Sequence, residues 1–255
     1  MFCVLKVQKR RNTIFEKVFG SFIKDEYDVQ TIPVFKGAPF YLLNITLGKR
    51  EICWEDVITA VGKCSSRLVT NCEMVLPQNM NVGLFKSEVL YDKMMKNTFI
   101  QILENSDTKN HPVSVSISDE KAEYTEFTER LSLYASTLTI ATQNKEKYFP
   151  VCEEITENIG LCPVLKTDFD NAKVKINTFN NIMTIDYDGQ FFNIHNGEDF
   201  TVPHIYENLL PDGVNQYDFY SALYELCGVF SLGNCIFENI YVNNEKKPVA
   251  DVHFA

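Results

Sequence analysis

The densest group of residues that could do chemistry is the segment 63–67, which reads Lys-Cys-Ser-Ser-Arg and follows Gly62. It combines a thiol, two hydroxyls and two cations. Backbone amides in a tight turn can form a concave site for an anion, and basic side chains add charge to it. The predicted anion-binding residues are therefore Lys63, Ser65, Ser66 and Arg67. The alternative is an ordinary surface turn, because serine and glycine are common in turns that bind nothing.

Two pairs of aspartates have the D-x-D spacing, in which alternate side chains of one loop can chelate a divalent ion. The pairs are Asp168 with Asp170 and Asp186 with Asp188. The second pair is better explained by a hairpin turn, because the Asp-Gly dipeptide at 188–189 suits positive φ angles. The first pair follows a predicted strand, at the edge where open α/β sheets bind ligands. A spacing this short is frequent by chance, so no metal site is predicted.

Histidines and cysteines form no catalytic or metal-binding pattern. The histidines lie outside any string that pairs a base with a nucleophile, and they are His111, His195, His204 and His253. No two of the eight cysteines have the C-x-x-C spacing of a zinc or redox site. Their apolar neighbours predict reduced thiols that are mostly buried. The sequence therefore identifies no catalytic residue.

Composition indicates an acidic globular protein of one large domain or two modest ones. The chain has 255 residues, of which 45% are hydrophobic, and a net charge of −10. That charge repels phosphate backbones, so binding to nucleic acid or to an anionic membrane is not expected. No apolar run reaches the roughly 18 residues of a membrane span, and the first residues do not read as a secretory signal. We expect a cytoplasmic protein of unknown partners, with a small-molecule ligand as one candidate.

The elements that would position these residues are clearest in the middle of the chain. Hydrophobic patterning predicts three strands and two helices in strict alternation, namely strand 113–117, helix 122–134, strand 138–141, helix 145–159 and strand 163–165. Such alternation is typical of a parallel sheet with crossover helices. The predicted fold class is therefore α/β.

The flanking regions do not show the strict alternation of strands and helices that this core has. Before it, the patterning predicts strands at 2–7, 13–19, 39–47, 67–70 and 74–76, a short helix at 55–61, and the longest amphipathic helix of the chain at 84–103. After it, strands separated by Asn-Asn and Asp-Gly predict an antiparallel meander, followed by a helix at 215–226 and a strand at 237–242. We therefore predict an N-terminal α+β domain at 1–109. A Rossmann-like three-layer domain with a mixed sheet, the meander and the C-terminal helix is predicted at 110–255.

The first strand-to-helix turn of this core, at 118–123, lacks the glycines of a dinucleotide site. Such a site has G-x-G-x-x-G here, so that backbone amides can approach a diphosphate. This chain has Ser-Asp-Glu-Lys-Ala-Glu instead. The carboxylates of Asp119, Glu120 and Glu123 would face the diphosphate with like charge.

The segment after the second predicted strand resembles a cofactor-binding turn. Residues 138–147 read LTIATQNKEK, which is similar to the second strand and the asparagine-plus-basic turn of nicotinamide-binding domains in Rossmann-type oxidoreductases of the shikimate dehydrogenase-like branch. The resemblance implies that Asn144 and Lys145, with Lys147, contact the ribose phosphate of NADP. Two features depart from the family, because the arginine expected in this turn is missing and no lysine–aspartate pair in 1–109 matches its catalytic residues.

These observations predict a fold rather than a chemistry. The expected function is that of a non-enzymatic or regulatory protein built on a degenerate Rossmann-like domain. No cofactor is expected, because the motif that would specify one is absent. The alternative is an oxidoreductase-like enzyme that binds NADP or another nucleotide at a non-standard site, at the carboxyl ends of strands 113–117 and 138–141.

Overall fold

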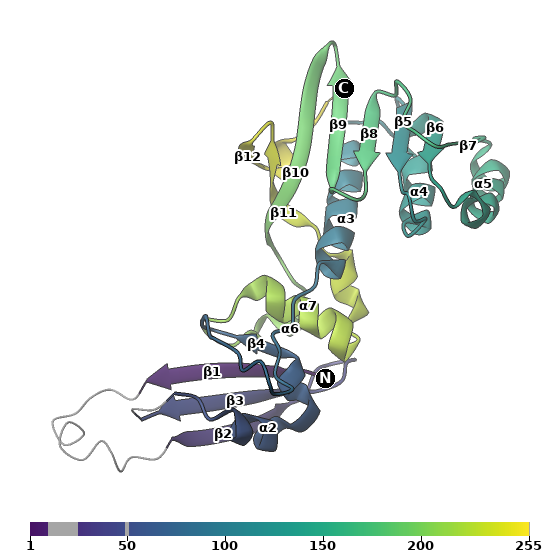
Figure 1. Ribbon diagram of the computed structural model, residues 1–255. Helices are drawn as coiled ribbons and strands as arrows, with labels where there is room; N and C mark the ends of the chain where they lie inside the picture. The colour runs from purple at the N-terminus through teal and green to yellow at the C-terminus, as the bar shows by residue number, and fades with distance from the viewer. Residues whose placement is uncertain (10–24, 49–50, 255) are drawn as a thin grey trace. The chain divides into compact units, whose positions relative to one another are not determined.

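The computed structural model describes residues 1–9, 25–48 and 51–254. The chain divides into two compact units, and each unit is built from two separate segments of sequence (Figure 1). The first unit consists of Met1–Leu90 and Val202–Gly233, and the second consists of Tyr91–Thr201 and Asn234–Ala255. The chain therefore passes from one unit to the other after residues 90, 201 and 233.

The first unit contains a four-stranded sheet in the order β2-β3-β1-β4. Its strands are β1 (Cys3–Lys9), β2 (Glu26–Ile32), β3 (Phe40–Leu47) and β4 (Leu68–Thr70). β1 runs parallel to β3 and β4, whereas the edge strand β2 is antiparallel to β3. The predicted strand 13–19 lies outside the described residues, and the predicted strand 74–76 does not form. β2 is absent from the sequence-based prediction.

Helices pack against both faces of this sheet. They are α2 (Trp54–Val61), α6 (His204–Glu207) and α7 (Gln216–Cys227), with short 3-10 turns at Gly62–Ser66 and Phe230–Asn234. On one face, Val57 of α2 belongs to the same core as Leu5. Phe2 and Phe40 point to the opposite face, because side chains alternate along a strand. There the ring of Phe219 in α7 lies 5.9 Å from that of Phe2 and 5.4 Å from that of Phe40.

The second unit contains an eight-stranded sheet in the order β12-β11-β10-β9-β8-β5-β6-β7. Its strands are β5 (Val113–Ser118), β6 (Ala135–Ala141), β7 (Val164–Lys166), β8 (Val174–Asn177), β9 (Ile182–Tyr187), β10 (Gln190–Phe200), β11 (Phe237–Val242) and β12 (Glu245–Pro248). β5 is parallel to β6 and β8, and β6 is parallel to β7. The predicted parallel strands are thus confirmed, with α4 (Thr125–Ser132) and α5 (Lys145–Ile159) as their crossover helices.

The remaining strands of this sheet form an antiparallel meander, as predicted. The hairpin between β9 and β10 turns at Asp188 and Gly189, whose φ angles are 49° and 76°. Positive φ at both positions matches the right-handed twist of the flanking strands. The Asp-Gly dipeptide is therefore a turn, and Asp188 is positioned by backbone geometry.

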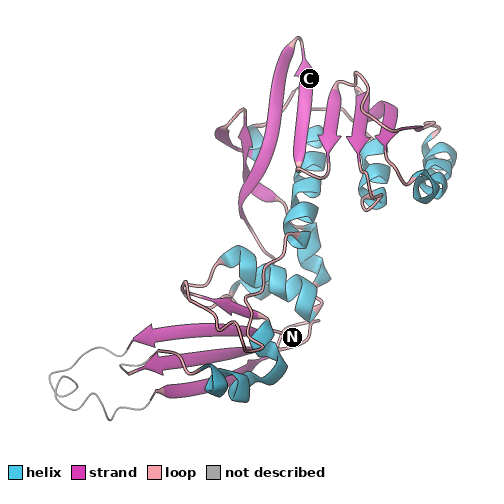
Figure 2. Cartoon of the chain, viewed as in Figure 1, coloured by secondary structure: helices cyan, strands magenta, loops and turns pink. Residues whose placement is uncertain are grey.

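The main helices of the second unit all lie on one face of its sheet (Figure 2). Besides α4 and α5 they include α3 (Val89–Asn105), which is joined to α4 by a 2.7 Å hydrogen bond from Arg130 to Asn97. On the other face the loop 167–173 crosses β5 and β6. In β5, valine and isoleucine alternate with serine, which is typical of a sheet with one helix-covered face. The α/β class and the mixed sheet are confirmed, but this unit has two layers where three were expected.

The compact units also differ from the domains expected from the sequence, at 1–109 and 110–255. Helix α3 belongs to the second unit, because its Thr98 hydroxyl accepts a hydrogen bond from the amide of Phe237 at 3.0 Å. Helix α7 belongs to the first unit, because Phe219 packs on the rings of Phe2, just before β1, and of Phe40 in β3. Both assignments depend on long-range packing, which local hydrophobic patterning does not encode.

Gly197 marks a close approach between β10 and β11. The register of this strand pair shifts between His195 and Gly197, and Gly197 lies opposite Ile240. A Cβ atom added at Gly197 would lie 2.0 Å from a ring carbon of Phe237, well inside contact distance. The amide of Gly197 donates to the hydroxyl of Tyr91 at 2.9 Å, and the Tyr91 ring lies 5.0 Å from that of Phe237. Only glycine fits this position without displacing the ring.

We therefore expect Gly197→Ala to lower the free energy of unfolding by about 1–3 kcal/mol, the usual cost of forcing extra atoms into a packed core. Thermal denaturation followed by circular dichroism measures this loss. Phe237→Ala is the matched second change, because it removes the ring atoms that the added Cβ would meet, including the Cγ atom of Phe237 at 2.2 Å. The double variant should lose less stability than the two single losses added together, and strict additivity would contradict the proposed contact.

Candidate functional site

The two turns at which a Rossmann-type domain holds its cofactor lie next to each other here, at the carboxyl ends of β5 and β6. The amide of Asp119, just after β5, donates to the carbonyl oxygen of Ala141, the last residue of β6, at 3.0 Å. A second main-chain hydrogen bond of 3.3 Å runs from Gln143 to Glu120. Ligands of open α/β sheets bind at this edge. The geometry of the two turns therefore decides what this edge can hold.

The carboxylate of Asp119 fills the first turn. Asp119 is 2% exposed, and its two oxygens accept hydrogen bonds from the amides of Glu123 (3.1 Å) and Tyr124 (2.8 Å). A third hydrogen bond comes from the hydroxyl of Tyr148 in α5, at 2.7 Å. These amides lie at the start of α4, where unpaired N–H groups and the helix dipole favour a negative charge. An internal anion thus occupies the donors that a bound phosphate would use.

Ala122 in the same turn has a backbone conformation that glycine usually supplies. Its φ angle is 55°, and its amide donates to the carbonyl of Asp119 at 3.1 Å. A left-handed conformation costs a residue with a Cβ atom about 1–2 kcal/mol. The hydrogen bonds to the Asp119 carboxylate hold the following amides in place and offset that cost. The turn therefore keeps a tight path without the glycines of a dinucleotide site.

The predicted phosphate-binding residues of the second turn lie beside the first one. Asn144 precedes α5, and its side-chain amide donates to the carbonyl of Glu120 at 3.4 Å. The ammonium of Lys147 donates to the carbonyl of Lys121 at 3.3 Å. Lys145 is the first residue of α5 and is exposed. The structure thus places all three residues at one edge, with Asn144 and Lys147 holding the acidic turn.

The predicted anion-binding residues lie in the first unit, in and just after the 3-10 turn Gly62–Ser66. The hydroxyl of Ser65, which is 1% exposed, donates to the carbonyl of Asn81 at 2.8 Å. The hydroxyl of Ser66 donates to the carbonyl of Lys63 at 3.0 Å. Lys63 and Arg67 are exposed. Both serine protons are used within the fold, so an anion here would depend on the two cations.

A buried lysine lies close to the first turn and is absent from the sequence-based prediction. Lys96 of α3 is 2% exposed, and its ammonium donates to the carbonyl of Thr178 at 3.1 Å and to the side chain of Asn181. It also lies 4.5 Å from the centroid of the Tyr124 ring. The carboxylate of Asp92 accepts hydrogen bonds from Tyr124 and Asn181. A polar cluster therefore connects α3, the turn after β5 and the turn after β8.

Burial lowers the pKa of Lys96 to about 8, although the nearby charges of Asp92 and Asp119 act in the opposite direction. An amine with such a pKa can serve as a base or a nucleophile when substrate reaches it. Lys96 already contacts two oxygen atoms and an aromatic face. In the folded protein Lys96 therefore links α3 to the turn after β5 and the turn after β8. No local sequence signal separates it from Lys93 in the same helix, because only the packing differs.

No protein-family model, curated protein or solved structure matches this chain. Within the described residues, no helix has the length and apolar character needed to cross a membrane. No group of three or more histidine, cysteine, aspartate or glutamate side chains in those residues could hold a metal ion. The chemistry of the site is therefore argued from its own geometry.

The first pair of aspartates with D-x-D spacing, Asp168 and Asp170, makes hydrogen bonds within the fold. Asp170 accepts hydrogen bonds from Thr139 of β6 at 2.6 Å and from Lys166 at 3.1 Å. The bond from Thr139 is the main cause that lowers the pKa of Asp170, and Lys166 adds to it. Asp168 accepts from Thr167 at 2.6 Å. Asp170 therefore attaches the loop 167–173 to the sheet.

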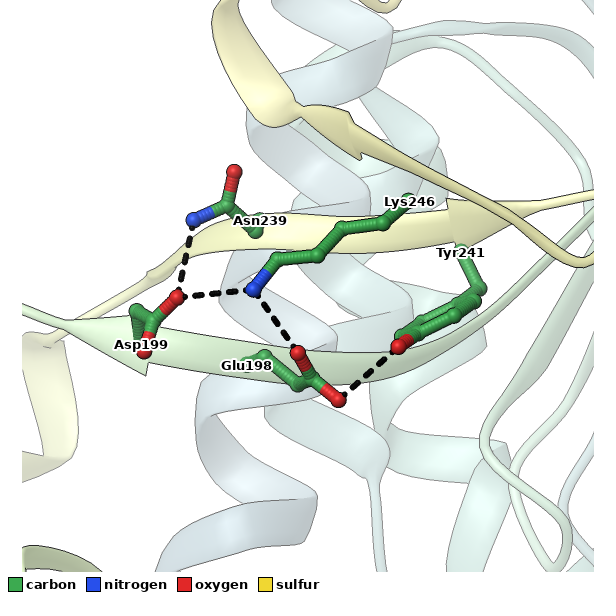
Figure 3. Close-up of polar contacts among 5 residues, drawn as sticks. All are labelled: Glu198, Asp199, Asn239, Tyr241 and Lys246. Atoms are coloured by element: carbon green, nitrogen blue, oxygen red, sulfur yellow. Dashed lines mark hydrogen bonds and ion pairs between the residues drawn. The ribbon is translucent and has the colours of Figure 1, made fainter.

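A second polar cluster lies on the strands β10, β11 and β12 (Figure 3). Lys246 is 2.8 Å from Glu198 and 3.0 Å from Asp199, while Tyr241 donates to Glu198 and Asn239 donates to Asp199. The hydrogen bonds to the carboxylates raise the pKa of Lys246, and those from Lys246 lower the pKa of Glu198 and of Asp199. All three groups stay ionised at neutral pH. The cluster fastens the edge strand β12 and offers no free base.

The cysteines are more exposed than we predicted from the apolar residues next to them in the sequence. All eight are free, but only Cys3 and Cys227 are buried, and Cys72 and Cys162 are exposed. The prediction that most are buried is therefore wrong, because an apolar neighbour in sequence does not fix the side of an element that a residue faces. Burial raises the pKa of Cys3 to about 12 and that of Cys227 to about 11, so these two thiols stay protonated.

We expect Asp119→Ala to lower the free energy of unfolding by about 3 kcal/mol, because two amides and a tyrosine hydroxyl would lose their acceptor. Urea denaturation followed by circular dichroism measures the loss. Glu120→Ala is the control, because Glu120 is exposed and its removal should cost less than about 0.5 kcal/mol. Equal losses in the two variants would contradict a special role for the Asp119 carboxylate.

The lowered pKa of Lys96 predicts a pH dependence of stability with a definite sign. Below pH 8 the amine is protonated in the folded and the unfolded chain, so the cost of burying its charge is fully present. Between pH 8 and 10.5 only the unfolded chain keeps the proton, and stability rises with pH, by up to about 3 kcal/mol.

Lys96→Met should remove this rise, whereas Lys93→Met, one turn earlier in the same helix, should keep it. The measurement is the free energy of unfolding in urea at several pH values, taken as the difference between each variant and the wild type. Burial raises the pKa of the Cys3 and Cys227 thiols, so their titration lowers the stability of the wild type and of both variants above pH 9. Taking the difference from the wild type cancels this common effect. A wild-type slope in Lys96→Met would refute the assignment.

Proposed function

We propose that this is a non-enzymatic or regulatory protein whose second unit is a degenerate Rossmann-like domain without a dinucleotide site at its first turn. The order β7-β6-β5-β8 supports the likeness, because it is the order of the first four strands of a Rossmann sheet, 3-2-1-4. One observation carries the functional part of the proposal. The Asp119 carboxylate accepts hydrogen bonds from the amides of Glu123 and Tyr124. These amides lie where a Rossmann-type domain binds the diphosphate of its cofactor.

Electrostatics oppose a diphosphate at this turn. A phosphate oxygen placed about 4 Å from the Asp119 carboxylate would meet a repulsion of about 4 kcal/mol at an effective dielectric constant of about 20. The ligand would also have to displace that carboxylate from three donors. Glu120 and Glu123 add further negative charge next to it. Binding energy from a ribose and a base would first have to overcome these costs.

The second turn supports the alternative, an enzyme that binds NADP or another nucleotide in a non-standard way. Lys145 is exposed at the start of α5, where the helix dipole also favours an anion. Against this alternative, Asn144 and Lys147 donate to main-chain carbonyls of the first turn. A nucleotide bound here would gain the ammonium of Lys145 and would lose two existing hydrogen bonds. We therefore favour the regulatory function.

We also propose that the protein acts in the cytoplasm. All eight of its cysteines are free, including the exposed Cys72 and Cys162. Exposed free thiols persist in a reducing compartment and tend to oxidise outside it. The net charge of −10 favours partners other than nucleic acid.

Titration calorimetry with NADP and NAD tests the proposal. We expect a dissociation constant weaker than about 1 mM for both, which corresponds to less than about 4 kcal/mol of binding free energy. A micromolar constant for NADP that disappears in Lys145→Glu would overturn the proposal in favour of the nucleotide-binding enzyme. Lys175→Glu is the control, because it changes the net charge by the same amount but lies in β8 rather than at the start of α5.

A further inference from the structure

A cavity of about 750 Å³ lies in the second unit, at the amino end of β5. Its apolar wall includes Val113, Ile185 and Phe254, of which Ile185 is 1% and Phe254 is 8% exposed. Its polar wall includes Lys173 and Asp186. Pockets of roughly 300–1,000 Å³ with an apolar lining and a few polar groups are typical of small-molecule sites. This cavity is separate from the turn at Asp119, which follows the other end of β5.

The cavity arises because the β9–β10 hairpin is longer than its neighbour. Ile185 of β9 pairs with Val174, the first residue of β8, so Asp186 and Tyr187 extend past the start of that strand. Figure 1 shows the hairpin, in green, reaching beyond β8 and β5. The space beneath it is bounded by the turn 106–112 that joins α3 to β5.

Buried hydroxyls hold this turn in place. Ser106, 1% exposed, donates to the carbonyl of Ile102 at 2.7 Å and accepts from the amide of Phe254 at 2.9 Å. Thr108, 2% exposed, donates to the carbonyl of Leu103 at 2.8 Å. Hydrogen bonds therefore fix the turn 106–112 and Phe254 on one side of the cavity. Because the cavity is already formed, little binding free energy would be lost in ordering the protein around a ligand.

The charges at this cavity are arranged unusually. Lys173 and Asp186 are joined through their backbones by a 2.8 Å hydrogen bond, yet their side chains form no ion pair with each other or with any other described residue. The ammonium of Lys173 lies 5.7 Å from the centroid of the Tyr187 ring. In contrast, the carboxylate of Asp107 accepts a hydrogen bond from the side-chain amide of Asn110 and lies 3.4 Å from the imidazole of His111. One cation and one anion therefore remain available beside an apolar floor.

From this arrangement we propose that the cavity binds a small zwitterion with an apolar side chain, an α-amino acid or a short apolar peptide. The ligand carboxylate pairs with Lys173, the ligand ammonium pairs with Asp186, and the side chain lies against Ile185 and Phe254. A ligand with only a carboxylate would face Asp186 with like charge, and one with only an amine would face Lys173. This site does not depend on the function proposed above.

Titration calorimetry with L-phenylalanine and L-leucyl-L-leucine tests the proposal on the full chain. The matched partial ligands are 3-phenylpropionate, which lacks the ammonium, and 2-phenylethylamine, which lacks the carboxylate. We expect at least one zwitterion to bind ten or more times tighter than either partial ligand. Tighter binding of the dipeptide would assign a peptide, and tighter binding of phenylalanine a free amino acid, and both results support the site.

Variants locate the binding. Lys173→Gln and Asp186→Asn should each weaken binding of the zwitterion tenfold or more, with an unchanged unfolding midpoint. The controls are Lys175→Gln, two residues along in β8, and Asp188→Asn in the adjacent turn, where asparagine tolerates the positive φ angle. Both controls should bind as the wild type does. Absence of binding by both zwitterions, equal binding of a partial ligand, or wild-type binding by Lys173→Gln and Asp186→Asn overturns the proposal.

Discussion

The arrangement of the second unit depends on one buried carboxylate. Asp119 joins the end of β5 to the start of α4 through two amides and to α5 through the hydroxyl of Tyr148. A buried charge is tolerated only when hydrogen bonds replace its hydration, and here three donors do so. The same interaction that fixes the two crossover helices also places a carboxylate against the amides of the first turn. Structure and binding capacity at this edge are thus set by the same atoms.

The one-sided covering of the sheet shapes the rest of this unit. With α3, α4 and α5 on one face, the other face is left to polar side chains and to the loop that Asp170 attaches. Parallel strands with both faces covered are usually apolar throughout. In this chain the other face carries the serines of β5, one of which is covered by the protein, and the charged cluster of β10 to β12 (Figure 3). The polar face therefore needs no second helical layer.

Much of the local structure could be predicted, because it depends on residues that are close together in the sequence. The alternation across 113–166, the Asp-Gly hairpin at 188–189 and the cap of α7, where Asn215 accepts from the amide of Asp218, all follow from periodicity and turn chemistry. The partition of helices between units could not be predicted, because the partners of Phe219 and Thr98 are distant in sequence. Lys96 and the cavity beneath β9 were missed for the same reason. Their properties come from residues that only folding brings together.

The interleaved order of segments has a consequence for how the chain is made on the ribosome. Phe2 and Phe40 leave the ribosome early, but their partner Phe219 follows only after the residues from 91 to 201 have been translated. At roughly 5–20 residues per second, that delay is on the order of ten seconds. During this interval the nascent N-terminal sheet presents an uncovered aromatic face. The protein should therefore be a client for chaperones that bind emerging chains, and its N-terminal sheet should mature only as the last third of the polypeptide appears.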